Sequence, residues 1–65
     1  MTEHEQMWRK EYAKTLKLLM HRKNISIRQL ALELGVSKSA VGFYVNGDRL
    51  PNAYIAQRIK EILSQ

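Results

Sequence analysis

Five residues between positions 37 and 46 recur at helical spacing: Lys38, Ser39, Gly42, Phe43 and Asn46. They carry a cation, a hydroxyl, no side chain, an aromatic ring and an amide. On a helix with about 3.6 residues per turn they lie on one side, and we call them the outward set. The opposite side is mostly apolar: Ser37, Ala40, Val41, Tyr44 and Val45. Lysine and serine donate hydrogen bonds, and a ring offers apolar surface. The outward set could therefore contact a partner that presents acceptors and methyl groups side by side.

Gly42 is the unusual member of this set, because a glycine inside a helix costs about 1 kcal/mol relative to alanine. Without a side chain, the backbone can come close to a partner. Other interpretations stay open: Gly42 could relieve crowding against a neighbouring helix, and Phe43 could pack into the core or a dimer seam. Lys38 could be an ordinary surface lysine. The five outward residues taken together favour a binding surface.

Helical periodicity extends along the whole chain and predicts the elements that position this surface. No segment alternates apolar and polar residues as a strand would. The first predicted helix runs from about residue 6 to residue 22, with an apolar stripe of Trp8, Tyr12, Leu16, Leu19 and Met20. The remaining helices are predicted over 26–34, 37–46 and from Asn52 onward. We expect an all-α fold, a compact bundle of four, or at most five, short helices.

Caps and turn residues mark where the predicted helices begin and end. Ser26, Ser37 and Asn52 are good N-cap residues, and Ser26 with Gln29 matches a capping box. Gly35 ends the second helix only two residues before the next cap. Two short helices joined by such a turn form a helix-turn-helix.

Length and composition exclude several classes of protein. The 65 residues suffice for one small domain, 1–65, and we expect residues 1–5 to be frayed. Cysteine is absent, and His4 and His21 have no companions at metal-ligand spacing. We find no nucleotide-binding or nucleophile motif, no signal peptide and no apolar run long enough for a membrane. We therefore expect a cytoplasmic protein that is not an enzyme and uses no metal, cofactor, small-molecule substrate or membrane.

The net charge of +5 is concentrated in the middle of the chain. Residues 14–49 hold seven Lys and Arg against two Asp and Glu, whereas residues 1–13 have a net charge of −1. A basic region of this kind favours a polyanionic partner such as nucleic acid. The alternative is a surface charged only for solubility.

The segment from Ile25 to Leu63 resembles the lambda repressor and Cro family of helix-turn-helix domains. The residues that fit the general pattern are Ser26, Leu30, Ala31, Gly35, Val41, Asn46 and Gly47. "SAVG" at 39–42 and "NAY" at 52–54 add to the likeness. The resemblance implies a phage or prokaryotic transcription regulator, a repressor or Cro-type protein. It would bind a palindromic operator in double-stranded DNA, with helix 37–46 in the major groove.

Site residues follow from the same resemblance. It implies base contacts by Lys38, Ser39 and Phe43, with Gly42 at the close approach, and phosphate contacts by Lys17, Asn46, Arg49 and Asn52. Where the family usually has glutamine after the second helix cap, this chain has Ile27. Backbone amides at Ile27 could still hold a phosphate, and Arg28 could add charge.

Assembly is the second departure from the family. The lambda repressor domain dimerises through a fifth helix, whereas this chain ends just after the predicted fourth helix. We expect a weak homodimer, strengthened on DNA, whose seam includes Val45 and Tyr54. The competing hypothesis is a protein-interaction module, an antirepressor or adaptor, with Trp8, Tyr12 and Phe43 as anchors.

Overall fold

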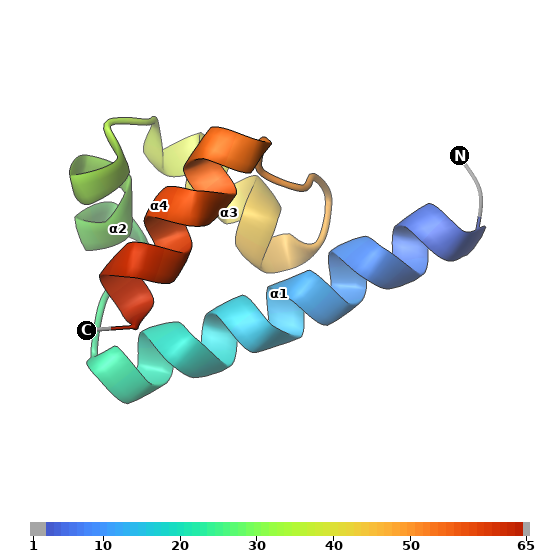
Figure 1. Cartoon of the computed structure of the whole chain (residues 1–65), viewed down its shortest axis with the longest axis horizontal. Coiled ribbons are helices and arrows are strands. Elements are labelled where there is room, and N and C mark those ends of the chain that lie inside the picture. The colour runs from blue at the N-terminus through green and yellow to red at the C-terminus, as the bar shows by residue number, and fades with distance from the viewer. Residues whose placement is uncertain (1–2, 65) are drawn as a thin grey trace.

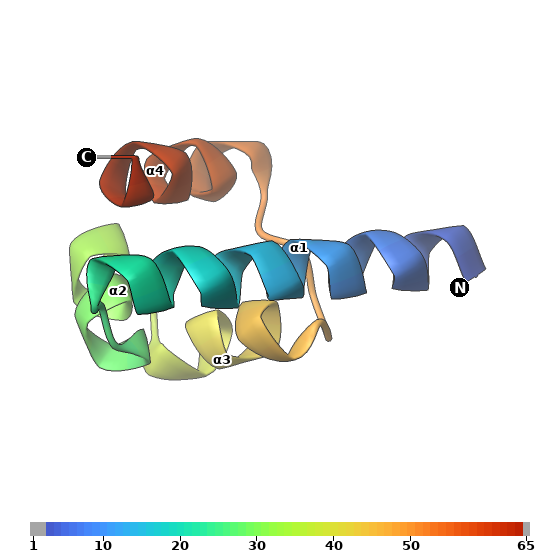
Figure 2. The ribbon, with the colours of Figure 1, turned by 90° about the horizontal axis from the view of Figure 1, so that it is seen from below.

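Four α-helices make up the part of the chain that the computed structural model describes, residues 3–64. They are α1 (Glu3–Lys23), α2 (Ile27–Leu34), α3 (Lys38–Asn46) and α4 (Ala53–Leu63). Helices α3 and α4 pack against α1, and α2 packs against α3 and α4. The N-terminal turns of α1 extend beyond the other helices (Figure 1). Seen from below, α3 and α4 lie on opposite sides of α1 (Figure 2). Within the described residues no strand occurs, and the all-α prediction is confirmed.

The first helix is longer than the sequence pattern predicts. It begins at Glu3, so residues 3–5, which we expected to be frayed, are helical. Residues 1–2 lie outside the described part of the chain. Trp8, the first residue of the predicted apolar stripe, is 62% exposed, whereas Leu16 and Met20 are buried. At its N-terminal end α1 extends beyond the other helices (Figure 1).

Each of the three shorter helices begins at the cap that the sequence predicts. The hydroxyl oxygens of Ser26 and Ser37 each accept a hydrogen bond, at 3.1 Å, from the backbone amide three residues further on. Asn52 Oδ1 accepts one at 2.8 Å from the Ile55 amide. Caps of this kind satisfy amides that have no partner inside the helix.

Left-handed residues end the first three helices and turn the chain. Asn24 has φ 56°, Gly35 has φ 72° and Gly47 has φ 80°. In each case the amide of the following residue bonds back into the last helical turn, at 2.9–3.1 Å. The Gly35 turn brings α2 and α3 together after three residues, as the helix-turn-helix interpretation requires.

The core lies where α1, α2, α3 and α4 meet. Leu16, Leu30 and Val41 have the most completely buried side chains. The cluster is completed by the following side chains: Met20, Ala31, Leu34, Tyr44, Val45, Ile55, Ile59 and Leu63. All four helices contribute to it, so the core fixes how α3 is presented.

Gly47 holds the end of α3 close to α1. A Cβ built there would meet Arg9 O at 3.4 Å and Ala13 Cβ at 3.7 Å, and φ is already left-handed. These are ordinary van der Waals distances, so the strain of a side chain at this position would come from the left-handed backbone. Glycine is therefore favoured at the turn that ends α3 beside α1.

Candidate nucleic-acid interface

Helix α3 exposes the side that its sequence pattern predicts. Val41 is fully buried, whereas Lys38, Ser39 and Asn46 are exposed and Phe43 is 42% exposed. The inward residues of α3 join the core formed with α1 and α2. The outward side of α3, defined as Lys38, Ser39, Gly42, Phe43 and Asn46, therefore faces solvent.

Gly42 lies in open space on this side. A Cβ built on it has no neighbour within 4 Å, so the glycine does not relieve crowding against α2. Its φ is not among the positive values found at Gly35 and Gly47, so its backbone conformation does not require glycine either. What the glycine provides is a flat place on the helix where another molecule can approach the backbone.

Phe43 is held by a contact that the sequence pattern does not reveal. The Arg49 guanidinium lies over the Phe43 ring, 5.2 Å from its centroid. A cation over an aromatic face at this distance is attracted by the ring, and at exposed sites the contact contributes about 0.5–1 kcal/mol. Because the chain turns back at Gly47, residues six apart meet at the outward side of α3. Arg49 thereby places a positive charge beside the exposed Phe43 ring.

The N-terminus of α2 offers backbone amides and the exposed side chain of Arg28. Ser26 Oγ accepts a hydrogen bond from the Gln29 amide. The amides of Ile27 and Arg28 belong to the first turn of α2 and therefore have no acceptor within the helix. The Ile27 side chain is half-buried and packs against the core. Ile27 can therefore meet a phosphate only through its backbone, whereas the Arg28 side chain is exposed.

Asn52 and Lys17 are also at the surface. Asn52 uses Oδ1 to cap α4, which leaves its side-chain NH₂ group as a donor. Lys17 is one helical turn after Ala13, whose side chain lies near Gly47. It is therefore near the side of α1 on which Ala13 lies. The ion pairs Lys14–Glu11 and Arg58–Glu61, both at 3.9 Å, leave Lys17 uninvolved.

The two residues predicted for a dimer seam have different surroundings. Tyr54 is 70% exposed near the start of α4. Val45 is only 6% exposed, because its side of α3 faces the core. The assignment of Val45 to a seam is therefore corrected: its side chain stabilises the monomer.

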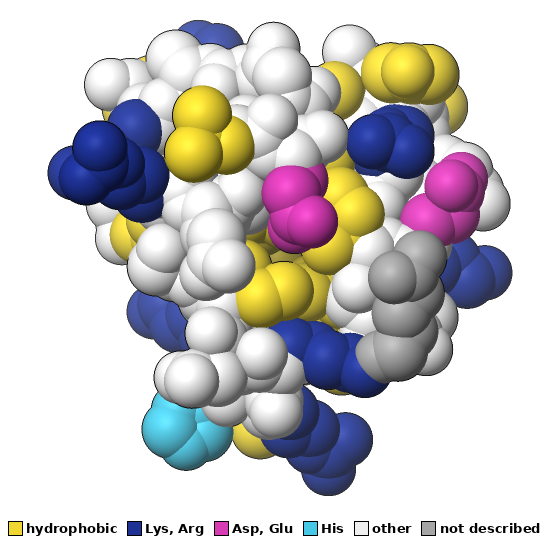
Figure 3. Space-filling model, turned by 90° about the vertical axis from the view of Figure 1, so that its left-hand side faces the viewer, with side chains coloured by type: hydrophobic (Ala, Val, Ile, Leu, Met, Phe, Trp, Pro, Cys, Tyr) yellow, Lys and Arg dark blue, Asp and Glu magenta, His cyan; other side chains and the backbone are white. Residues whose placement is uncertain are grey.

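Other parts of the surface are chemically less distinctive. At the end of the molecule seen in Figure 3, charged side chains of both signs surround a small apolar area. A surface hollow there is lined by Lys23, Ile25, Glu33, Arg58 and Ile62. Between residues 6 and 64, no three His, Cys, Asp or Glu residues are grouped as a metal site would require. No helix in the same range is long and apolar enough to span a membrane.

Comparison with known proteins assigns the family. The helix-turn-helix family model matches residues 16–64, which covers the C-terminal part of α1 and all of α2, α3 and α4. No curated protein and no solved structure matched the chain. The match includes both capped helices, the Gly35 turn and the outward side of α3. The chain thus belongs to the lambda repressor and Cro-like helix-turn-helix family, a family of DNA-binding transcription regulators.

Proposed function

We propose that this protein is a sequence-specific transcriptional repressor of the Cro type, which inserts α3 into the major groove of duplex DNA. The observation that carries the proposal is the outward side of α3, where Lys38, Ser39 and Phe43 surround a glycine with open space in front of it. Major-groove base edges offer acceptors for lysine and serine, and a thymine methyl group for the ring. The protein would act in the cytoplasm of a prokaryotic cell or of a phage-infected host.

Phosphate contacts would hold α3 in register. The proposed set comes from α1, α2, the end of α3 and the loop after it, and it comprises Lys17, the backbone at Ile27, Arg28, Asn46, Arg49 and Asn52. Such contacts fix position and orientation but carry no sequence information directly. Sequence discrimination would therefore depend on Lys38, Ser39 and Phe43.

A two-fold pair on a palindromic operator is part of the proposal. One short helix reads only a few base pairs, so a second α3 is needed for useful specificity. A symmetric dimer requires half-sites about 34 Å apart, one turn of DNA. We propose that the pair is weak in free solution and is strengthened on DNA.

The second candidate function is a protein-interaction module, and the 62% exposure of Trp8 is the observation that favours it. Tryptophan often anchors protein interfaces. The two candidates differ in salt dependence, because DNA binding releases counterions whereas an aromatic-anchored contact does not.

The deciding experiment begins with selection of bound sequences from random duplex DNA, followed by affinity measurements across a range of salt concentrations. We expect a palindromic consensus and a steep fall of affinity with salt. Lys17→Ala should reduce the salt slope by about 0.9 for each binding subunit if that lysine neutralises one phosphate. Lys14→Ala is the matched control, because Lys14 is also an exposed lysine of α1 but is paired with Glu11. An affinity that does not change with salt would contradict DNA binding.

A further inference from the structure

A groove between α1 and α4 lies apart from the surface proposed for DNA. Its lining consists of Tyr12, Thr15, Leu16, Leu19, Ala56, Ile59, Lys60, Leu63 and Ser64. None of these residues belongs to the outward side of α3 or to the proposed phosphate contacts, and α3 packs on the other side of α1 (Figure 2). The groove has a volume of about 560 Å³, within the range of about 300–1,000 Å³ that is usual for small-molecule sites.

Most of the lining is apolar, and part of it belongs to the core. Leu16, Ile59 and Leu63 are at most 4% exposed. Tyr12, Leu19 and Ala56 are only half-buried, so both walls of the groove present apolar surface to water. A ligand with an apolar body would remove that surface from water, which is favourable.

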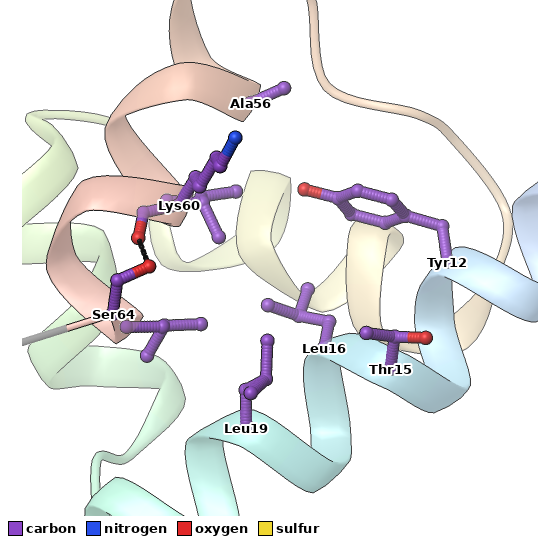
Figure 4. Close-up of a pocket in the computed structure, with 9 residues that line it drawn as sticks. Tyr12, Thr15, Leu16, Leu19, Ala56, Lys60 and Ser64 are labelled. Carbon is purple, nitrogen blue, oxygen red and sulfur yellow. Dashed lines mark hydrogen bonds between the residues drawn. The ribbon is translucent and has the colours of Figure 1, made fainter.

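Two hydrogen-bond donors meet at one end of the groove. The Tyr12 phenol extends from α1 towards α4, and the Lys60 side chain lies at the same end as Ala56 (Figure 4). Among the described residues, neither the Tyr12 hydroxyl nor the Lys60 ammonium has an ion pair or a hydrogen-bond acceptor. Burial raises the pKa of Tyr12, and Tyr44 raises it further, so the phenol keeps its proton. This end of the groove therefore offers one cation and one neutral donor.

These two donors indicate the head group of a ligand. A carboxylate carries a single negative charge on two oxygens, and each oxygen can accept from one of the donors. A phosphate group carries a charge of about −1.5 to −2 on three oxygens, so one cation would leave much of it unmatched. A cationic head group would be repelled by Lys60. The polar end of the groove is therefore best matched by a carboxylate.

The length of the groove indicates the tail of the ligand. Tyr12 and Leu19 are seven residues apart on α1, a distance of about 10 Å at a rise of about 1.5 Å per residue. An extended chain advances by about 1.2 Å per bond. An unbranched tail of about eight carbons would therefore run from the polar end of the groove to Leu19.

We propose that the groove between α1 and α4 binds a monocarboxylate with an unbranched apolar tail of about eight carbons. Its carboxylate accepts from Lys60 and Tyr12, and its tail covers Leu16, Leu19 and Leu63. The acid is a ligand and not a substrate. Because the groove is separate from α3, this proposal does not rest on the proposed function.

Octanoate is the probe, and octanol is its uncharged counterpart with the same tail. Nuclear magnetic resonance spectra of the whole protein, without DNA, would be recorded during titration with each compound. We expect saturable shifts at Leu16, Leu19 and Leu63, with a Kd for octanoate on the order of 1 mM, as is usual for a ligand with about ten non-hydrogen atoms. Butanoate should bind at least about tenfold more weakly, because each buried methylene contributes up to about fourfold.

Three variants test the polar end of the groove. Lys60→Met keeps an apolar stem without the charge and should weaken octanoate binding by about twofold to fivefold, the range for an exposed ion pair, while octanol binding is unchanged. Tyr12→Phe removes only the hydroxyl and should weaken octanoate binding by about twofold to tenfold. Lys14→Met is the matched control, because Lys14 is an exposed lysine of α1 outside the groove lining, and it should bind octanoate like the wild type.

Four results would overturn the assignment. The first two are shifts that do not saturate up to about 10 mM octanoate, and shifts confined to residues outside the groove. The third is a Lys60→Met variant that binds octanoate like the wild type. The fourth is movement of the groove signals with protein concentration alone, which would assign the groove to a second copy of the chain. Because DNA is absent, none of these results bears on DNA binding, which the separate salt experiment tests.

Discussion

Replacement of Gly42 by alanine separates the two properties that a recognition helix combines, its stability and its close approach to a partner. The added methyl group would meet no atom within 4 Å, and Gly42 is not among the glycines with positive φ. Alanine can therefore adopt the same conformation without strain. Because alanine is the better helix former, we expect the free energy of unfolding to rise by up to about 1 kcal/mol.

The same methyl group should weaken DNA binding. It would project from the outward side of α3, between Lys38 and Phe43 on neighbouring turns, where the proposed complex brings the backbone close to base edges. Moving the helix outward by the thickness of a methyl group would lengthen the hydrogen bonds of Lys38 and Ser39. A good base contact is worth about 1–3 kcal/mol, so the expected loss of affinity is roughly 5-fold to 150-fold.

Two measurements on one purified variant test this reasoning. Thermal unfolding should show an unchanged or higher midpoint, with about 4–8 °C corresponding to 1 kcal/mol in a domain of this size. Titration with a selected operator should show the loss of affinity. Gly47→Ala is the contrasting control and should lower the midpoint, because φ is 80° there and alanine is strained in the left-handed conformation. A marked drop in midpoint for Gly42→Ala would place Gly42 inside the protein, and unchanged binding would refute the close approach.

Further substitutions distinguish side chains that would read bases from those that would contact phosphates and those that stabilise the fold. Lys38→Ala should relax the preference at one base pair, a guanine, by about 1–3 kcal/mol, and Phe43→Ala should reduce the preference for thymine over cytosine; affinities for single-base operator variants measure both. Arg49→Ala should lower the salt slope by about 0.9 per subunit, and equal slopes for variant and wild type would exclude its phosphate contact. Ser37→Ala removes the cap of α3 and should reduce stability by about 1 kcal/mol in a denaturant titration.

Local features were the most predictable part of this fold. The caps at Ser26, Ser37 and Asn52 each depend on one side chain and on an amide three residues away, so a short stretch of sequence contains the whole interaction. The sides of α3 were predictable for a similar reason, because about 3.6 residues per turn fixes which side chains share a side. Val41 and Lys38 accordingly lie on opposite sides, one buried and one exposed.

Features that depend on distant neighbours were harder to predict. Periodicity placed Trp8 on the same apolar stripe as Leu16. It could not show that Leu16 is buried whereas Trp8 is exposed, because that depends on which part of α1 the other helices cover. Val45 lies on the inward side of α3, and only the packed structure shows that the core takes up its side chain completely. The contact between Arg49 and Phe43 requires the Gly47 turn to bring a loop back over the helix. No sequence spacing rule describes that contact.

The small size of the domain explains why two copies would be needed on DNA. A chain of this length buries only about 60% of its unfolded surface, so it has little core to spare for additional recognition elements. One α3 offers three base-reading side chains, and enlarging that set would require a longer helix and more core to support it. A second copy supplies the same contacts again without any new core.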